Sequence, residues 1–209
     1  MRRIAAHLLV AMLSLAAWQV LGTVWPSARF TIGRPTEIAT ELWSLCKSGQ
    51  LFRDFGVTAG EAAAGLVIGT VAGSAVGLAM WYSNRVAILA RPYVVAVGAV
   101  PVFAFAPLMI VWFGIGFSMK MALAAFSTFF VALAQAYRGA TLVGPELSDT
   151  LVAMRATRRQ LFIKVIVPGS LDWVLASARM NVGFGLLGAF IGEFIAADRG
   201  LGHLMLKAA

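Results

Sequence analysis

Long apolar runs limit this chain more than any other feature of its sequence. A helix needs about 20 residues to cross the hydrocarbon core of a bilayer. Runs of about this length occupy residues 4–25, 57–82, 92–112, 118–137 and 174–196. The chain of 209 residues is 60% hydrophobic and 12% charged, whereas soluble domains are usually about 45–50% apolar and about 25% charged. We therefore predict an all-α protein, a polytopic bundle of about five transmembrane helices in a lipid bilayer.

Residues 1–56 are expected to form a first part, ahead of a membrane core at 57–209. The run at 4–25 could be a signal peptide, whose apolar core has about 7–15 residues before a small-residue cleavage site. This run is longer, and Trp25 with the proline that follows it is a poor cleavage context, so we favour a retained span. A short amphipathic helix outside the membrane is expected to start at Pro35.

A row of glycines marks the second apolar run. Gly65, Gly69, Gly73 and Gly77 recur every four residues and therefore lie on one side of a helix. Small residues let another helix approach closely within lipid, so we interpret the row as a helix-packing face. A phosphate-binding loop would require Gly-Lys-Ser/Thr at its end, which the sequence does not contain. The chain therefore has no visible means of hydrolysing ATP itself.

Two sets of residues are candidates for a pathway through the bilayer. Pro101 and Pro107 interrupt the third run, and helix breaks in membranes are tolerated where protein or a water-lined cavity satisfies the freed carbonyls. The alternative is a kinked helix that only packs. Arg179 and Glu193 place charges in or near the ends of the fifth run, where they either serve a pathway or reach the interface.

Residues 83–91 are predicted to form a short basic turn.

Residues 144–172 form a long polar interruption within the apolar second half. The segment is basic, and the excess of Lys and Arg on the cytoplasmic side predicts that it, and the N-terminus, lie there. We expect two short helices that meet at Ala156 and Thr157. Thr157 matches a capping box with the glutamine three residues later, and Pro168 should prevent the second helix from continuing smoothly into the fifth run. The segment either lies on lipid as an amphipathic helix or is presented to a soluble partner.

The remaining composition argues against several other functions. The formal net charge is +8, but the basic residues are scattered between apolar runs and form no stripe for nucleic acid. Cys46 is the one cysteine, so neither an intrachain disulfide nor a cysteine metal cluster is expected. His7 and His203 lie at opposite ends without the carboxylate pairs or spacing of a metal or catalytic site. No enzyme activity of its own, cofactor or metal is indicated.

The polar segment resembles the cytoplasmic loop of permeases from bacterial ABC importers. That loop carries Glu-Ala-Ala, a glycine four positions later, and an ending of hydrophobic-x-hydrophobic-Pro. Here Asp149, Thr150 and Leu151 occupy the Glu-Ala-Ala places, Arg155 the glycine place, and Pro168 the end. The stretches RPYVVAVGAVPVFAFAPLMIVWFGIG and GEFIAADRGLGHLM are similar to those of the nitrate/sulfonate/taurine subgroup. The resemblance extends over roughly residues 35–206.

This resemblance implies a non-catalytic transport subunit in the bacterial inner membrane. It implies a homodimer in which cytoplasmic ABC ATPase subunits dock on the loop at 146–168. It also implies a periplasmic or lipid-anchored solute-binding protein, which delivers a small anion such as nitrate, sulfonate or taurine. The chain departs from the family pattern at Arg155 and lacks the span that usually follows the Gly-Leu-Gly stretch. The alternative is therefore a non-transporting scaffold, or a truncated or degenerate permease that only binds partners.

Overall fold

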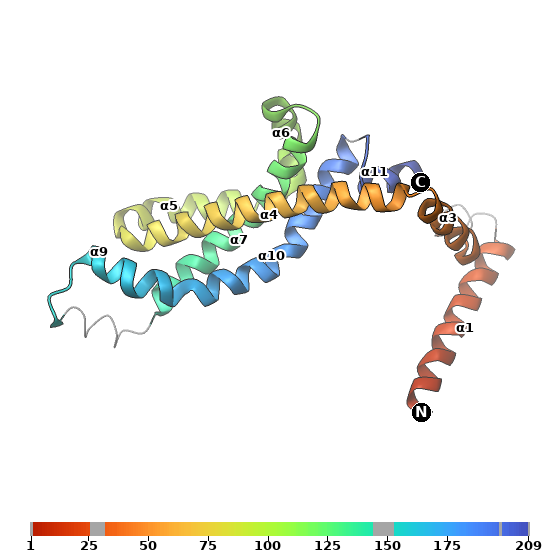
Figure 1. Ribbon diagram of the computed structural model, residues 1–209, viewed down its shortest axis with the longest axis horizontal. Coiled ribbons are helices and arrows are strands. Elements are labelled where there is room, and N and C mark those ends of the chain that lie inside the picture. The colour runs from red at the N-terminus through yellow and green to blue at the C-terminus, as the bar shows by residue number, and fades with distance from the viewer. Residues whose placement is uncertain (1, 26–31, 144–152, 197, 209) are drawn as a thin grey trace. The chain divides into compact units, whose positions relative to one another are not determined.

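The computed structural model describes residues 2–25, 32–143, 153–196 and 198–208, and all regular elements among them are helical (Figure 1). The all-α prediction is confirmed. The helices are α1 (Arg2–Val24), α3 (Pro35–Lys47), α4 (Gln50–Tyr82), α5 (Asn84–Gly98), η1 (Val102–Phe105), α6 (Ala106–Phe113), α7 (Phe117–Leu142), α9 (Arg158–Leu161), η2 (Phe162–Ile166), α10 (Val167–Ile195) and α11 (Leu201–Ala208).

Within the described residues, four helical stretches are long and apolar enough to cross a membrane. They are Ala6–Val24, Gln50–Tyr82, Phe117–Leu142 and Arg158–Ile195. The helices of Asn84–Gly98 and Val102–Phe113 form a bent pair that would make a fifth span. The expectation of about five transmembrane helices therefore agrees with the structure.

The chain divides into two compact units, Met1–Arg53 and Asp54–Ala209. In the first unit, α1 contacts the start of α3 through side chains. The amide nitrogen of Gln19 lies 3.1 Å from the Thr36 hydroxyl, and the Arg34 side chain donates to the Gly22 carbonyl at 3.1 Å. Pro35 occupies the first turn of α3, where a missing N–H costs no helical hydrogen bond.

The core of the second unit is a close packing of α4, α7 and α10 (Figure 1). The glycine row of α4 faces the backbone of α7. A Cβ at Gly69 would overlap the Thr128 hydroxyl and the Ala125 carbonyl oxygen, and one at Gly73 would overlap the Phe129 carbonyl oxygen. Larger residues would therefore force the two helices apart, because the atoms they meet belong mainly to the α7 backbone.

A buried amide joins the same three helices. Asn181 of α10 is fully buried; its amide nitrogen donates to the Thr128 carbonyl of α7 at 3.1 Å and lies 3.3 Å from the Thr70 hydroxyl of α4. Polar groups are costly within an apolar environment unless they are hydrogen-bonded. These bonds therefore favour one register of the three helices over others.

The third apolar run does not form one kinked helix. Helix α5 and the pair of η1 and α6 meet at 95°, and Pro101 immediately precedes η1. Pro107 lies in the first turn of α6. Both prolines therefore occupy helix starts, which tolerate a missing N–H. Figure 1 shows α6 turned away from the direction of α5.

The predicted basic turn at 83–91 is wrong, because α5 already begins at Asn84. The Ser83 side chain accepts a hydrogen bond from the Val86 amide and caps the helix. Arg91 donates to the Tyr137 hydroxyl at 3.1 Å and lies over the Tyr137 ring. The Arg91 side chain thus has a partner on a neighbouring helix and does not need an exposed turn. The prediction failed because it used charge alone.

We predict that Gly69→Ala destabilises the protein by about 1–3 kcal/mol, the usual cost of inserting a methyl group into a filled core. A thermal unfolding assay in detergent, read by size-exclusion elution, measures this change. Gly183→Ala is the matched control, because a Cβ there meets no atom within 4 Å. Equal melting temperatures for the two variants would contradict the packing account.

Candidate functional site

The polar segment leads directly into a membrane-spanning helix. Thr157 caps α9, and its hydroxyl accepts from the Gln160 amide at 3.3 Å. The Gln160 side chain in turn accepts from the Thr157 amide at 2.8 Å. This is the capping box that the sequence predicts. Ala156 precedes the cap, whereas Asp149, Thr150 and Leu151 lie outside the described residues.

A π turn replaces the regular α-helix just before Pro168, but the helical run does not end there. From Arg158 to Ile195 the chain is helical without interruption, with Pro168 in the first turn of α10. The preceding five residues form the π-helix η2, and the Val167 amide donates to the Phe162 carbonyl. A proline removes one donor and crowds the preceding turn, and a π turn widens the helix there. The helix from Arg158 to Ile195 is therefore continuous, and we call it the lever.

Aromatic rings attach this lever to the end of α4. Phe162 stacks on Trp81 with ring centroids 5.8 Å apart and meets Tyr82 edge-on at 5.2 Å. The Arg158 guanidinium lies 6.0 Å from the Trp81 ring centre and 5.7 Å from that of Tyr82. Cation–π and aromatic pairs each contribute about 0.5–1.5 kcal/mol. Sequence reasoning missed Trp81 and Tyr82, because aromatic residues at the end of a span normally indicate only an interface.

Arg155 has an unusual backbone conformation at the corner before the cap. Its φ is 59°, and it is the one non-glycine residue with positive φ in the described part of the chain. The left-handed region costs an L-residue roughly 1–2 kcal/mol, whereas glycine adopts it freely. The glycine place of the family pattern thus coincides with a turn that suits glycine.

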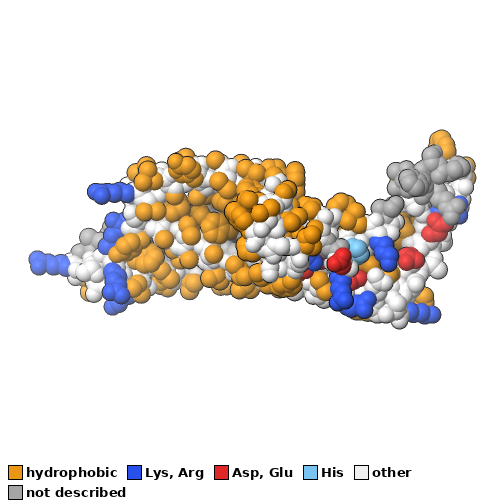
Figure 2. Space-filling view, turned by 90° about the horizontal axis from the view of Figure 1, so that it is seen from above, with side chains coloured by type: hydrophobic (Ala, Val, Ile, Leu, Met, Phe, Trp, Pro, Cys, Tyr) orange, Lys and Arg blue, Asp and Glu red, His pale blue; other side chains and the backbone are white. Residues whose placement is uncertain are grey.

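Basic side chains gather at this end of the second unit. Arg155, Arg158, Arg159 and Lys164 are all exposed. Figure 2 shows basic side chains at the left end of a predominantly apolar surface. This distribution is typical of a membrane protein whose cytoplasmic end carries the excess of Lys and Arg.

Arg179 and Glu193 occupy different environments in α10. Arg179 lies 12 residues after Val167 and 16 before Ile195, and it is exposed. It is therefore near the middle of α10, because the helix starts earlier than the sequence pattern indicated. Glu193 is fully buried near the other end.

Glu193 closes a buried polar cluster at the far end of α10. Its carboxylate accepts from the Thr58 hydroxyl at 2.6 Å and from the Gly202 amide at 2.7 Å. It thereby connects α4 to the N-terminus of α11, where a negative charge is favoured. Beside it, Lys120 of α7 lies 2.7 Å from Glu61 of α4. Opposite charges in two predicted spans are a signal that could have revealed this pair.

The fold and the site define a polytopic helical membrane protein that presents a stiff basic segment at one end. No group of three or more His, Cys, Asp or Glu side chains that could hold a metal occurs among the described residues. Residues 65–209 match the family described as the binding-protein-dependent transport system inner membrane component. The chain belongs to this family.

Curated relatives cover most of this chain. The aliphatic sulfonates transport permease SsuC of Escherichia coli, described as putative, is 30% identical over 93% of the chain and 74% of its own length. The riboflavin transport system permease RibX of Chloroflexus aurantiacus is 31% identical over 93% and 72%. The formylaminopyrimidine transport permease ThiX of Halalkalibacterium halodurans is 29% identical over 88% and 76%. Their named cargoes differ widely.

The chain is therefore a multi-pass inner-membrane permease of an ABC importer, the non-catalytic membrane component of the transporter. Membership in a binding-protein-dependent family implies ATPase and solute-binding partners. The relatives transport different compounds by name, so membership alone does not determine the substrate.

We predict that Arg155→Gly slows hydrogen exchange of the amides at 156–161, since relief of the left-handed strain stabilises the corner by about 1 kcal/mol. Exchange measured by mass spectrometry on the protein in detergent would show this. Arg155→Ala is the control, because it removes the charge and keeps the strain. If both variants change protection equally, charge and not backbone conformation is responsible.

Proposed function

We propose that this permease moves a small anion across the inner membrane, driven by ATPase subunits that dock on residues 146–168. The pathway would lie between two copies of the chain, with a solute-binding protein delivering the anion from outside. The continuous helix of Arg158–Ile195 carries the proposal, because it joins the docking segment to a membrane span without a flexible link. Closure of the ATPases would push this lever and tilt α10.

The aromatic contacts explain how a push would reach a second helix. Phe162 and Arg158 lie against the last turn of α4, so displacement of the segment would also displace α4. The glycine contacts then transmit the motion to α7, because helices in such close contact move together. Alternating access of a pathway requires such rigid movement of several helices, and a mobile loop would absorb it.

We infer the orientation of the chain in the membrane from the distribution of its Lys and Arg residues. The basic end of the second unit would face the cytoplasm, which places Tyr82 on the inside and the start of α4 on the outside. The N-terminus would then be cytoplasmic, since α1 and α4 each contribute one crossing. The amphipathic helix α3 would lie on the outer side, between these two crossings.

Arg179 supports an anionic cargo. A guanidinium near the middle of a span is costly in lipid, so such residues face a water-filled cavity or another protein. Arg179 is exposed in the single chain, and no salt bridge joins it to a carboxylate among the described residues. It would therefore face the pathway or the second copy, where it can bind sulfonate or nitrate oxygens. The bent pair containing Pro101 and Pro107 would supply another wall.

We predict that alanine at Asp149, Thr150 and Leu151 abolishes co-purification of the transporter's ATPase subunit with this permease. Replacement of Phe162 by alanine should instead preserve co-purification and lower the permease-dependent stimulation of ATPase activity, because it loosens the lever and leaves the docking patch intact. Arg85→Gln, an exposed substitution on α5 outside the docking segment, is the control. Unchanged association of the triple variant would refute docking at this segment.

We predict that Arg179→Gln lowers uptake of the anionic substrate in proteoliposomes by roughly 10–100-fold, since a hydrogen bond to a charged group contributes about 1.5–3 kcal/mol. Arg179→Lys should retain part of the uptake because the charge remains. Lys207→Gln, an exposed charge on α11, is the matched control. Normal uptake by Arg179→Gln would exclude a role in the pathway. Docking without uptake in every variant, the wild type included, would favour the non-transporting scaffold.

A further inference from the structure

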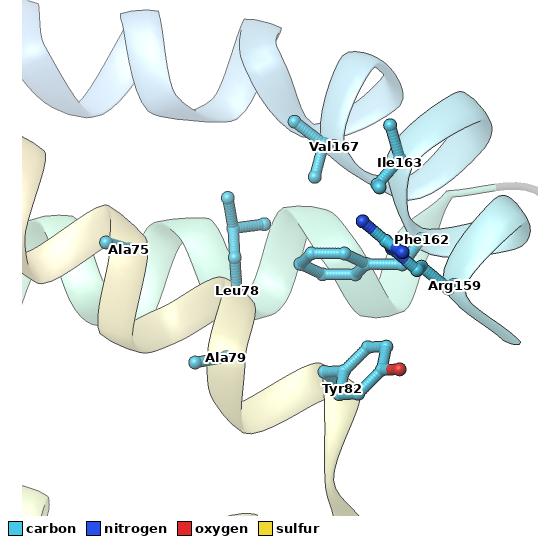
Figure 3. Close-up of a pocket in the computed structure, with 8 residues that line it drawn as sticks. All are labelled: Ala75, Leu78, Ala79, Tyr82, Arg159, Phe162, Ile163 and Val167. Carbon is cyan, nitrogen blue, oxygen red and sulfur yellow. The ribbon is translucent and has the colours of Figure 1, made fainter.

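A groove lies between the end of α4 and the start of the Arg158–Ile195 helix. Its volume is about 560 Å³. Figure 3 shows the residues that line it, with Leu78 and Tyr82 on α4 opposite Phe162, Ile163 and Val167. The alanines of α4 at 75 and 79 also line it, and their small side chains leave the space between the two helices unfilled. The lining is almost entirely apolar.

Arg159 is the charged residue of this lining. It differs from its neighbour Arg158, whose guanidinium lies over two aromatic rings. Arg159 is exposed, and no salt bridge joins it to a carboxylate within the described residues. Figure 3 shows its side chain among the residues that line the groove. The groove thus combines an apolar channel with one free positive charge.

The position of the groove narrows the class of ligand. Both of its walls belong to helices that are long and apolar enough to span a membrane, and it lies beside the exposed basic residues Arg158, Arg159 and Lys164. A groove at the end of a span is at the depth where phospholipid headgroups meet their acyl chains. Basic pockets between membrane helices at this depth suit anionic headgroups.

We propose that this groove binds one anionic phospholipid. Arg159 would contact the phosphate with its planar fork of donors, and an acyl chain would lie between Leu78 and Ile163. Binding needs no rearrangement, because the groove is already open in the single chain. The lipid would fill the gap between α4 and the lever, and so add contacts between the two elements that the Phe162 rings already join.

A lipid fits this groove better than a soluble protein does. Both walls of the groove belong to predicted spans, whose apolar flanks would face hydrocarbon and not water in a membrane. A water-soluble partner could reach Arg159 but not the channel between Leu78 and Ile163. A second copy of the chain would bury the apolar lining, but it would leave Arg159 in need of a carboxylate from the partner. Phospholipid supplies the acyl chain and the negative charge together.

The experiment uses the full chain in vesicles of phosphatidylglycerol and phosphatidylcholine that contain a trace of phosphatidylglycerol with a photoreactive acyl chain. We expect irradiation to label peptides within 75–82 or 159–167. Arg159→Gln should lower this labelling by about fivefold, the effect of one basic residue at a membrane surface. Lys164→Gln is the matched control, since it removes an exposed charge that does not line the groove.

Two further arms separate the alternatives. Ala79→Phe, which fills the groove, should abolish labelling; if it fails to elute as a folded species, Arg159→Gln at an exposed position still decides the question. Equal labelling of wild type and Arg159→Gln would overturn the proposal, as would equal labelling by a phosphatidylcholine probe. Crosslinks from the groove to a second permease copy or to the ATPase, with no lipid adduct, would show a protein occupant and also overturn it.

Discussion

The close approach of α4 and α7 is the contact on which the rest of the second unit depends. The glycine row lets α4 lie directly on the α7 backbone, where a single methyl group would overlap carbonyl oxygens. In lipid, helices gain little from excluding water, so packing at this distance and interhelical hydrogen bonds supply the association energy. Asn181 can reach both Thr70 and the Thr128 carbonyl only because these helices are so near. The hydrogen bonds of Asn181 therefore depend on the glycines of α4, whereas α10 also packs on α7 through its own Gly188.

The two ends of the bundle have different properties. At one end, the buried Glu193 carboxylate accepts hydrogen bonds from the Thr58 hydroxyl and the Gly202 amide, so moving α11 or α10 there would expose unpaired polar groups. At the other end, the docking segment contains exposed arginines and a residue with φ of 59°, and it lines an open groove. The contacts of Phe162 and Arg158 with the rings of α4 attach the segment there, without a buried carboxylate like that of the other end. A displacement applied at the basic end would thus pivot about the sealed end.

Much of this architecture could be predicted from the sequence. The approximate number of spans, the helix start at Pro35 and the capping box of Thr157 depend on local properties, and the structure agrees with each of them. The bounds at 83–91 and the effect of Pro168 depend on tertiary partners that no local pattern specifies. The Arg91 side chain donates to the Tyr137 hydroxyl of another helix, and a π turn of five residues precedes α10, in whose first turn Pro168 lies. The pairing of Lys120 with Glu61 likewise requires knowing which spans are neighbours.

The backbone at Arg155 connects these observations to the function. Its left-handed conformation shows that the corner geometry is kept even with a residue that disfavours it. Something outside Arg155 must therefore hold the corner, and within the described residues the capping box beside it and the ring contacts of Arg158 are the candidates. An arginine at the same corner also adds positive charge to the surface that an ATPase subunit would contact. The backbone strain at Arg155 thus lies beside a capped, ring-packed helix that continues into the membrane. An ATPase subunit that docks at this corner would meet a preformed surface.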